Sequence, residues 1–373
     1  MPSAPSSLSV LLAIALGTCA IASSSGADEG PPNVVVILLD DVGVDRVGAY
    51  GAHPNPGRTP TLDALCEAGA MFRNAWSMPL CSPTRASLLT GRYPSRHRVG
   101  AQIQPHNPNS AQLDPAEIII PECLHSHSNR VVGKWHLKRH GVPATHPLDT
   151  GFDGHVGSLF NLNGMGYWDW RKFTDGQYTN EPKYATTVTN EDALLALSQL
   201  PEPRFLYVAY NAAHGPFHVP PSNLHSYGQP MGDPMQFRAM AEAMDRELAQ
   251  LIEAIDLSNT YLFILGDNGT PNSAVDAPHD PTHAKATLYE GGVNVPFIVL
   301  GPGVVPGERQ ALVGVTDVFA TIMELTGSVA TAEDSISFVD VLYNVGELGQ
   351  REFLYAEKFD SFSSGTPLER AIR

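Results

Sequence analysis

A cysteine at the expected start of a helix is the first candidate for chemistry in this sequence. Residues 81–92 read Cys-Ser-Pro-Thr-Arg-Ala-Ser-Leu-Leu-Thr-Gly-Arg, and Ser82 and Pro83 suit the cap and first turn of a helix. The free N–H groups of a helix start attract anions, and Arg85 lies one turn further along. Cys81 is therefore either a reactive thiol in an anion-binding site or a structural cysteine buried beside an ordinary helix start.

Carboxylate and amide side chains follow two predicted strands. Residues 33–39 (Asn-Val-Val-Val-Ile-Leu-Leu) are typical of a strand buried on both faces, and a further buried strand is expected at 261–265. The side chains that follow these strands are Asp40, Asp41, Asp267 and Asn268. Ligands bind at the carboxyl ends of parallel strands, and oxygen ligands suit Ca²⁺ and Mg²⁺. The pattern predicts a divalent-cation site, with a helix cap and an Asp-Asn-Gly turn as the alternatives.

Two further segments place basic side chains where they could reach the same edge of a sheet. A short strand over 131–137 would put Lys134 and His136 on one face, because side chains alternate along a strand. His214 comes just after a strand expected at 204–210. A lysine and a histidine directed into a cleft suit oxyanion binding and proton transfer. A surface lysine and histidines that only cap or pack are the alternatives.

The elements that must position these residues fit one large α/β core or two modest ones, which a chain of 373 residues can bury. Further strands are expected at 295–300 and 351–355, and helices at 60–69, 184–199, 234–255 and 316–326.

The whole of residues 81–92 resembles the signature of the type I, formylglycine-dependent sulfatases, which is Cys-x-Pro-x-Arg followed by Leu-Thr-Gly-Arg. The chain is also similar to this family in Gly-Lys-Trp-His-Leu at 133–137, in Gly-Asp-Asn-Gly at 266–269 and in the segment from Lys285 to Pro296. The resemblance implies the α/β fold of the alkaline-phosphatase-like superfamily. That fold has a mixed, mostly parallel central sheet with helices on both faces.

The resemblance also implies a role for each candidate residue. In this family a formylglycine-generating enzyme oxidises the cysteine to formylglycine (3-oxoalanine), and the hydrated aldehyde is the nucleophile that attacks a sulfate ester. The implied cation, Ca²⁺ or alternatively Mg²⁺, is bound by Asp40, Asp41, Asp267, Asn268 and the converted Cys81. Arg85, Lys134 and Lys285 would stabilise the sulfate, His214 would protonate the leaving group, and His136 would be the base of the second step.

The implied activity is that of a sulfuric ester hydrolase acting on an aryl or carbohydrate sulfate, and two alternatives stay open. A phosphate mono- or diesterase of the same superfamily could use the same residues. A non-catalytic sulfatase-like protein is the other alternative. This second alternative is suggested by the C-terminus. The catalytic domain is expected at 30–373, and the family's antiparallel C-terminal subdomain is expected to be largely missing from it.

Charge and apolar runs bear on the partners and the compartment. The formal net charge of -16 argues against a nucleic-acid partner. Residues 9–22 are apolar and end in Ala-Ile-Ala, so residues 1–22 are predicted to be a secretory signal peptide and the protein to be secreted or periplasmic. Lipid anchoring through Cys19 is the minor alternative, and no later segment is expected to span a membrane. Cys66 and Cys123 could pair or stay separate buried thiols.

Aromatic residues are concentrated at 161–170, which contains Tyr167, Trp168 and Trp170 among glycines. This composition suits a loop that contacts substrate, and an ordinary packed loop is the alternative. The identity of the substrate stays open among an aryl sulfate, a sulfated polysaccharide and a glycosaminoglycan fragment.

Overall fold

The computed structural model describes residues 30–162, 166–359 and 368–373. The predicted signal peptide, with Cys19, lies outside the described residues. The chain divides into two units, Met1–Gly30 and Pro31–Arg373, and the account below concerns the second.

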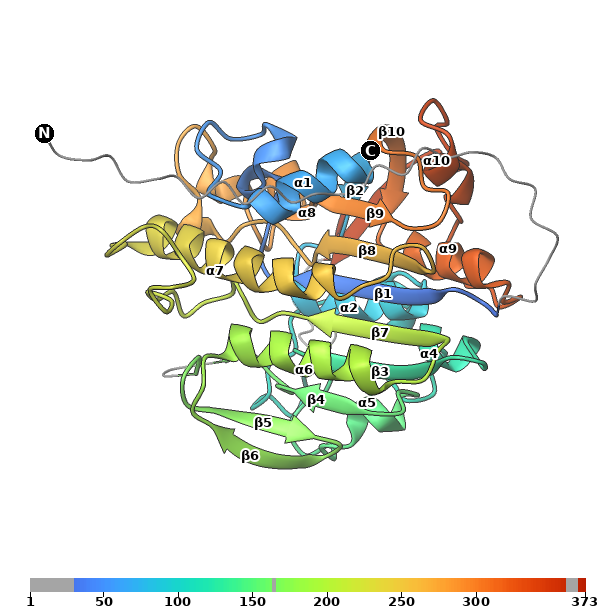
Figure 1. Cartoon of the computed structure of the whole chain (residues 1–373), viewed down its shortest axis with the longest axis horizontal. Coiled ribbons are helices and arrows are strands. Elements are labelled where there is room, and N and C mark those ends of the chain that lie inside the picture. Colours follow the sequence, from blue (N-terminus) through green and yellow to red (C-terminus); the bar gives the residue numbers. More distant parts are fainter. Residues whose placement is uncertain (1–29, 163–165, 360–367) are drawn as a thin grey trace, which may run out of the picture. The chain divides into compact units, whose positions relative to one another are not determined.

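Ten strands form one sheet in the order β10-β2-β9-β8-β1-β7-β3-β4-β5-β6 (Figure 1). They are β1 (Asn33–Leu39), β2 (Ala70–Trp76), β3 (Ser128–Gly133), β4 (His155–Gly157), β5 (Trp170–Thr174), β6 (Gln177–Glu181), β7 (Arg204–Ala209), β8 (Thr260–Gly266), β9 (Phe297–Leu300) and β10 (Gly307–Gly314). The central strands β8, β1, β7, β3 and β4 run parallel, whereas β9, β5 and β6 pair in the antiparallel sense. A separate antiparallel pair joins β11 (Tyr355–Lys358) to β12 (Glu369–Ile372). The predicted mixed, mostly parallel α/β sheet is confirmed.

Helices cover both faces of this sheet, and Figure 1 shows α6 and α7 across one of them. The helices are α1 (Pro60–Ala68), α2 (Cys81–Thr90), α3 (Pro94–His97), α4 (Ile120–Cys123), α5 (His146–Asp149), α6 (Ala185–Gln199), α7 (Asp233–Glu253), α8 (Glu290–Val293), α9 (Asp317–Thr326) and α10 (Val339–Tyr343). Alternate residues of β1 belong to separate hydrophobic clusters: Val34, Val36 and Leu38 to one, and Val35, Ile37 and Leu39 to the other. The first cluster includes side chains of α2, α4, α9 and α10, and the second includes those of α1, α6 and α7. This two-sided burial explains the continuous apolar run of β1.

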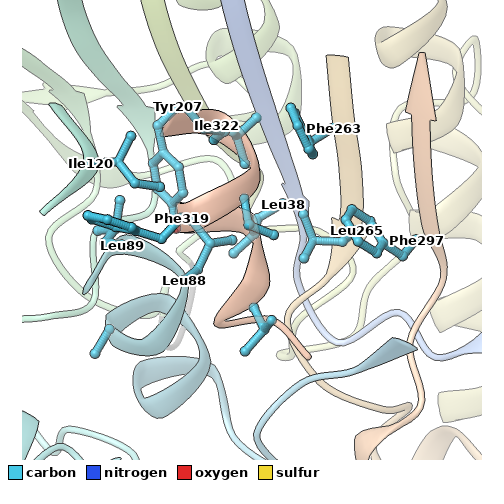
Figure 2. Close-up of a cluster of buried hydrophobic side chains, with 14 of the residues drawn as sticks. Leu38, Leu88, Leu89, Ile120, Tyr207, Phe263, Leu265, Phe297, Phe319 and Ile322 are labelled. Carbon is cyan, nitrogen blue, oxygen red and sulfur yellow. The ribbon is translucent and has the colours of Figure 1, made fainter. Parts of the chain in front are cut away.

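The apolar side of α2 fixes this helix against the sheet. Figure 2 shows Leu88 and Leu89 of α2 in one cluster with Phe319 and Ile322 of α9 and Leu38 of β1. Burying a leucine side chain stabilises the fold by roughly 1.5–3 kcal/mol. Hydrophobic packing along α2 therefore determines where the first residue of the helix stands.

The predicted elements are confirmed within two residues at each end, except for two strands. The strand expected at 131–137 ends at Gly133, whose φ of +94° turns the chain. A Cβ at this position would lie 2.0 Å from the carbonyl oxygen of Ala209, so only glycine allows this turn. The strand expected at 351–355 begins only at Tyr355, because Arg351 is held by α9 instead.

The two remaining cysteines do not pair. Cys66 and Cys123 are both free and buried, and they belong to the clusters on opposite faces of the sheet. Of the two options left by the sequence, separate buried thiols are confirmed. In the part of the chain that the structure describes, no helix is both long and apolar enough to cross a bilayer.

We predict that Arg351→Ala destabilises the fold strongly. Arg351 Nε donates to Asp317 Oδ2 at 2.5 Å, and the two side chains are only 6% and 2% exposed. Removing the guanidinium leaves the Asp317 carboxylate buried without its partner, which costs about 3–5 kcal/mol. Urea unfolding measures this loss. Lys183→Ala is the control: its pair with Glu191 is 64% and 51% exposed, so the loss should stay below about 1 kcal/mol. Equal losses would contradict the prediction.

Candidate active site

The carboxyl ends of four parallel strands bring the predicted residues to one edge of the sheet. Asp40 follows β1, Asp267 follows β8, and Lys134 follows β3. The Asp267 amide donates to the Leu39 carbonyl at 3.0 Å, and the Lys134 amide donates to the Ala209 carbonyl of β7 at 2.7 Å. These main-chain bonds continue the ladders beyond the strands, so the positions of the side chains are fixed by the sheet.

All ten predicted site residues lie in one cluster. Its members are Asp40, Asp41, Cys81, Arg85, Lys134, His136, His214, Asp267, Asn268 and Lys285. Hydrogen bonds and ion pairs join eight of them, while Cys81 and His136 contact each other and are within the electrostatic influence of Lys134. Lys134 Nζ donates to Asp40 Oδ2, and Lys285 Nζ donates to Asp41 Oδ1. Arg85 Nη2 donates to Asp267 Oδ2 at 2.7 Å and lies 3.7 Å from Asp40 Oδ2. Three carboxylates therefore stand against three cations in a buried space.

Two buried oxygens of this cluster have no hydrogen-bond partner: Asp40 Oδ1 and Asn268 Oδ1. Asn268 Nδ2 donates to Asp41 Oδ1 at 2.8 Å, so the amide oxygen of Asn268 is left to accept from another group. Buried polar atoms without a partner are costly, and a hard cation would satisfy such oxygens. The donor set therefore fits a divalent cation. His214 borders the same space, because one ligand atom each from Asp40, Asp41 and His214 lie within 4.8 Å of one another.

Burial and neighbouring charges separate the two adjacent carboxylates. Burial and the negative charge of Asp267 raise the pKa of Asp40 to about 7, although Lys134 opposes the shift. Burial also acts to raise the pKa of Asp41, yet Lys285 and His214 hold this pKa below its usual range. Asp41 further adopts a φ of +66°, a conformation that costs energy and that its surroundings must enforce. Asp40 is thus the carboxylate whose charge is least compensated by the protein.

Cys81 is the first residue of α2 and is fully buried. Its Sγ lies 3.2 Å from Nδ1 of His136. Burial raises the pKa of the thiol, even though Lys134 and Lys285 lower it. Burial therefore outweighs the nearby cations and favours the protonated thiol.

His136 presents an unprotonated nitrogen to residue 81. Its Nε2 lies 3.0 Å from the Ile103 carbonyl, which can only accept, so Nε2 carries the proton and Nδ1 is free to accept one. Burial, Lys134 and Arg85 keep the pKa of His136 well below its usual value, so the ring is neutral. His136 and Lys134 lie after the end of β3, so strand alternation is not the reason for their proximity. The main chain leaves the extended conformation in this segment, where Gly133 has a φ of +94° and His136 a φ of +54°.

The cluster has one open side. Eight of its ten residues are buried, and only His214 and Lys285 are partly exposed, with 17% and 13% of their side-chain surfaces accessible. His214 Nε2 lies 3.9 Å from Asp41 Oδ2, and Nδ1 lies 2.7 Å from the Gly215 carbonyl. Burial lowers the pKa of His214 to about 4, although Asp41 opposes the shift. A ligand must approach past these two side chains.

Two further segments support the site. The Ile103 carbonyl fixes the tautomer of His136, while Ser82 Oγ donates to the His136 carbonyl at 2.9 Å and accepts from the Ile103 amide at 3.1 Å. The Tyr167 hydroxyl lies 2.8 Å from the His214 carbonyl. No spacing pattern in the sequence marks Ile103, whereas Tyr167 belongs to the aromatic segment 161–170 singled out above.

Comparison with known proteins yields one consistent result. A family model described as "Sulfatase" matches residues 32–328. The N-acetylgalactosamine-6-sulfatase of Mus musculus is 30% identical, over 93% of this chain and 72% of its own length. The structure of Ps i-CgsB in complex with k-i-k-neocarrahexaose superposes with a TM-score of 0.78 at 24% identity, over 92% of this chain and 82% of the other. That of BT4656 in complex with its substrate D-glucosamine-2-N, 6-O-disulfate gives 0.72 at 17% identity, over 92% and 87%.

We predict that Ca²⁺ raises the melting temperature of the chelator-treated protein. A cation bound only by the folded state stabilises it by about 2.7 kcal/mol when its free concentration is 100 times Kd. Asp40→Asn removes one charge of the donor set and should abolish most of this rise, as followed by differential scanning fluorimetry. Asp192→Asn is the matched control, because Asp192 pairs with Lys172 on α6 and β5 and should leave the response intact. A melting temperature that is insensitive to Ca²⁺ would refute the cation site.

Proposed function

The chain belongs to the sulfatase family, and on this basis we propose that it hydrolyses an aryl or carbohydrate sulfate ester with a formylglycine derived from Cys81 and a bound divalent cation. The observation that carries the proposal is the position of Cys81. It is the first residue of a helix, it faces the lone pair of His136, and its thiol is within the electrostatic influence of Arg85, Lys134 and Lys285. Such a site suits an anion that must be attacked at the position of residue 81.

The side chain of residue 81 would need to be converted before the chain folds. Cys81 has no exposed surface, so a formylglycine-generating enzyme could not reach it in the folded protein. The raised pKa of the thiol argues that the unconverted residue is a poor nucleophile. A hydrated aldehyde at this position would supply two geminal oxygens, one to attack sulfur and one whose deprotonation releases the sulfate.

The remaining residues bind and orient the sulfate group. Asp40, Asp41, Asp267 and Asn268 would hold the cation, which would polarise the oxygens around the sulfur. With a divalent cation bound, the three carboxylates would no longer neutralise the site, and its net positive charge would favour a sulfate ester. The Arg85 guanidinium is fixed by Asp267 and by the Lys134 carbonyl at 2.7 Å, so it needs little reorganisation on binding.

Two histidines would move the protons. His136 Nδ1 can accept a proton from a hydroxyl at position 81. His214, on the open side, would protonate the leaving alcohol. The free imidazole of His214 is neutral at pH 7, and the negative charge of an incoming sulfate favours its protonated form.

We further propose that residues 1–22 direct the chain to a secreted or periplasmic location. The apolar run that ends in Ala-Ile-Ala supports this assignment. Mass measurement of the mature N-terminus would test it.

The first test of the function is sulfate release that depends on Cys81. Protein produced together with a formylglycine-generating enzyme should hydrolyse at least one of p-nitrophenyl sulfate, N-acetylgalactosamine-6-sulfate, D-glucosamine-2-N, 6-O-disulfate and k-i-k-neocarrahexaose. Cys81→Ala should release none. The control Cys123→Ala removes a buried thiol elsewhere and should keep both the conversion at position 81 and the turnover. A preference for p-nitrophenyl phosphate would assign the site to the phosphoesterase alternative.

Replacing His214 should affect poor leaving groups most. We predict that His214→Ala lowers kcat/KM for a carbohydrate sulfate by roughly 10²-fold or more, because the departing alkoxide needs a proton. Nitrophenolate is stable without one, so turnover of p-nitrophenyl sulfate should fall by less than roughly tenfold. His136→Ala should slow both substrates alike, because it acts on residue 81. Equal losses for both substrates in His214→Ala would exclude the acid role.

A further inference from the structure

An exposed tryptophan lies beside the open side of the site. Of the four tryptophans in the chain, Trp76, Trp135 and Trp170 are at most 5% exposed, whereas Trp168 is 40% exposed. Trp168 lies in a turn that ends two residues before β5 begins, and β5 and β6 form the last two strands of the sheet (Figure 1). Large apolar side chains on the surface are informative when they adjoin a functional site.

Two neighbours hold the Trp168 ring in place. Its centroid lies 5.0 Å from that of Tyr184 and 4.8 Å from that of His218, with the His218 ring at 74° to it. His218 is itself locked: Nδ1 lies 2.8 Å from the Pro216 carbonyl, and Nε2 is therefore left to accept from the Tyr184 hydroxyl at 3.1 Å. The exposed part of Trp168 is thus presented by rigid side chains.

This aromatic cluster is attached to the histidine of the open side. The Tyr167 ring packs on His218 with centroids 4.3 Å apart, and the Tyr167 hydroxyl bonds to the His214 carbonyl at 2.8 Å. His214 in turn faces Asp41. Tyr167 and His218 therefore link the main chain of His214 to the exposed Trp168 ring.

We propose that Trp168, supported by Tyr184 and His218, is a stacking platform for a sugar ring of the substrate, so that the enzyme selects carbohydrate sulfates. The proposal rests on the sulfatase function given above and narrows its substrate class. The face of an indole is negative and attracts the C–H groups on the apolar face of a pyranose. The neighbouring Asp169 is exposed and can accept hydrogen bonds from sugar hydroxyls. One exposed indole ring beside one carboxylate matches the size of a single sugar unit, whereas a protein partner would need a larger apolar surface.

Fluorescence of Trp168 tests the platform directly. The other three tryptophans are buried, so acrylamide quenching reports mainly on Trp168. In protein with an unconverted Cys81 and added Ca²⁺, at least one of the three carbohydrate sulfates named above should shield the fluorescence, and inorganic sulfate should not. Trp168→Phe should lose the shielded signal. Absence of shielding by all three sugars would overturn the platform, whether or not any sulfate ester is hydrolysed.

Kinetics of the converted enzyme separate binding from folding. Trp168→Ala should raise KM for a hydrolysed carbohydrate sulfate by roughly two- to tenfold and leave kcat unchanged, because it removes uniform binding. Trp168→Phe should recover part of the loss. The inhibition constant of inorganic sulfate should stay the same, since the sulfate pocket is intact. The control Tyr178→Ala removes another exposed ring, 56% accessible on β6, and should change nothing.

The two proposals fail in different ways. No Cys81-dependent sulfate release would defeat the sulfatase function, whatever the fluorescence shows. Sulfate release from a sugar with an unchanged KM in Trp168→Ala would overturn the platform and leave the sulfatase function standing.

Discussion

The buried guanidinium of Arg85 is the contact on which the rest of the site depends. Arg85 belongs to α2, bonds through two nitrogens to Asp267 beyond β8, and donates a third bond to the Lys134 carbonyl beyond β3. One side chain therefore connects the helix that carries Cys81 to two strand ends. A guanidinium with no exposed surface would be very costly without these partners. The cost enforces the register between helix and sheet, and hydrophobic packing of Leu88 and Leu89 holds the same helix from its other end.

Charge balance is the second constraint on the cluster. Three carboxylates and three cations neutralise one another, yet the compensation is uneven, because Asp40 keeps a raised pKa and an oxygen without a hydrogen bond. A buried carboxylate oxygen without a hydrogen bond destabilises the folded protein. It also favours cation binding, because a bound cation would interact with that oxygen and offset the cost of burying it. Asp41 is held in a strained backbone conformation by two hydrogen bonds. Lys285 Nζ and Asn268 Nδ2 both donate to its Oδ1.

The sequence predicted the sheet and the membership of the cluster because both depend on local signals. The apolar run of β1 and the polar residues after it determine a buried strand and its ligand-binding end, and the segment at 81–92 is specific enough to identify the family. The arrangement of the side chains within the site could be predicted less well from the sequence. The sequence pattern predicts that strand alternation puts Lys134 and His136 on one face. In the structure, the strand ends at Gly133, where the chain turns. The Ile103 carbonyl that orients His136 comes from a segment without any regular pattern, and the ion pair of Arg351 with Asp317 joins residues far apart in the chain.

The residues assigned to the reaction are mostly buried, whereas residues that could distinguish between substrates must lie on the surface. Eight of the ten site residues are buried, so in the proposed function they would contact only the sulfate group and the atoms next to it. The part of a substrate that differs between an aryl sulfate and a sulfated sugar must lie outside, against side chains near His214 and Lys285. The segment that carries Trp168 has an aromatic composition, but it has no motif that specifies a substrate. The motifs therefore identify the class of reaction, whereas under the proposal above the choice of substrate would depend on surface residues that only the folded chain brings together.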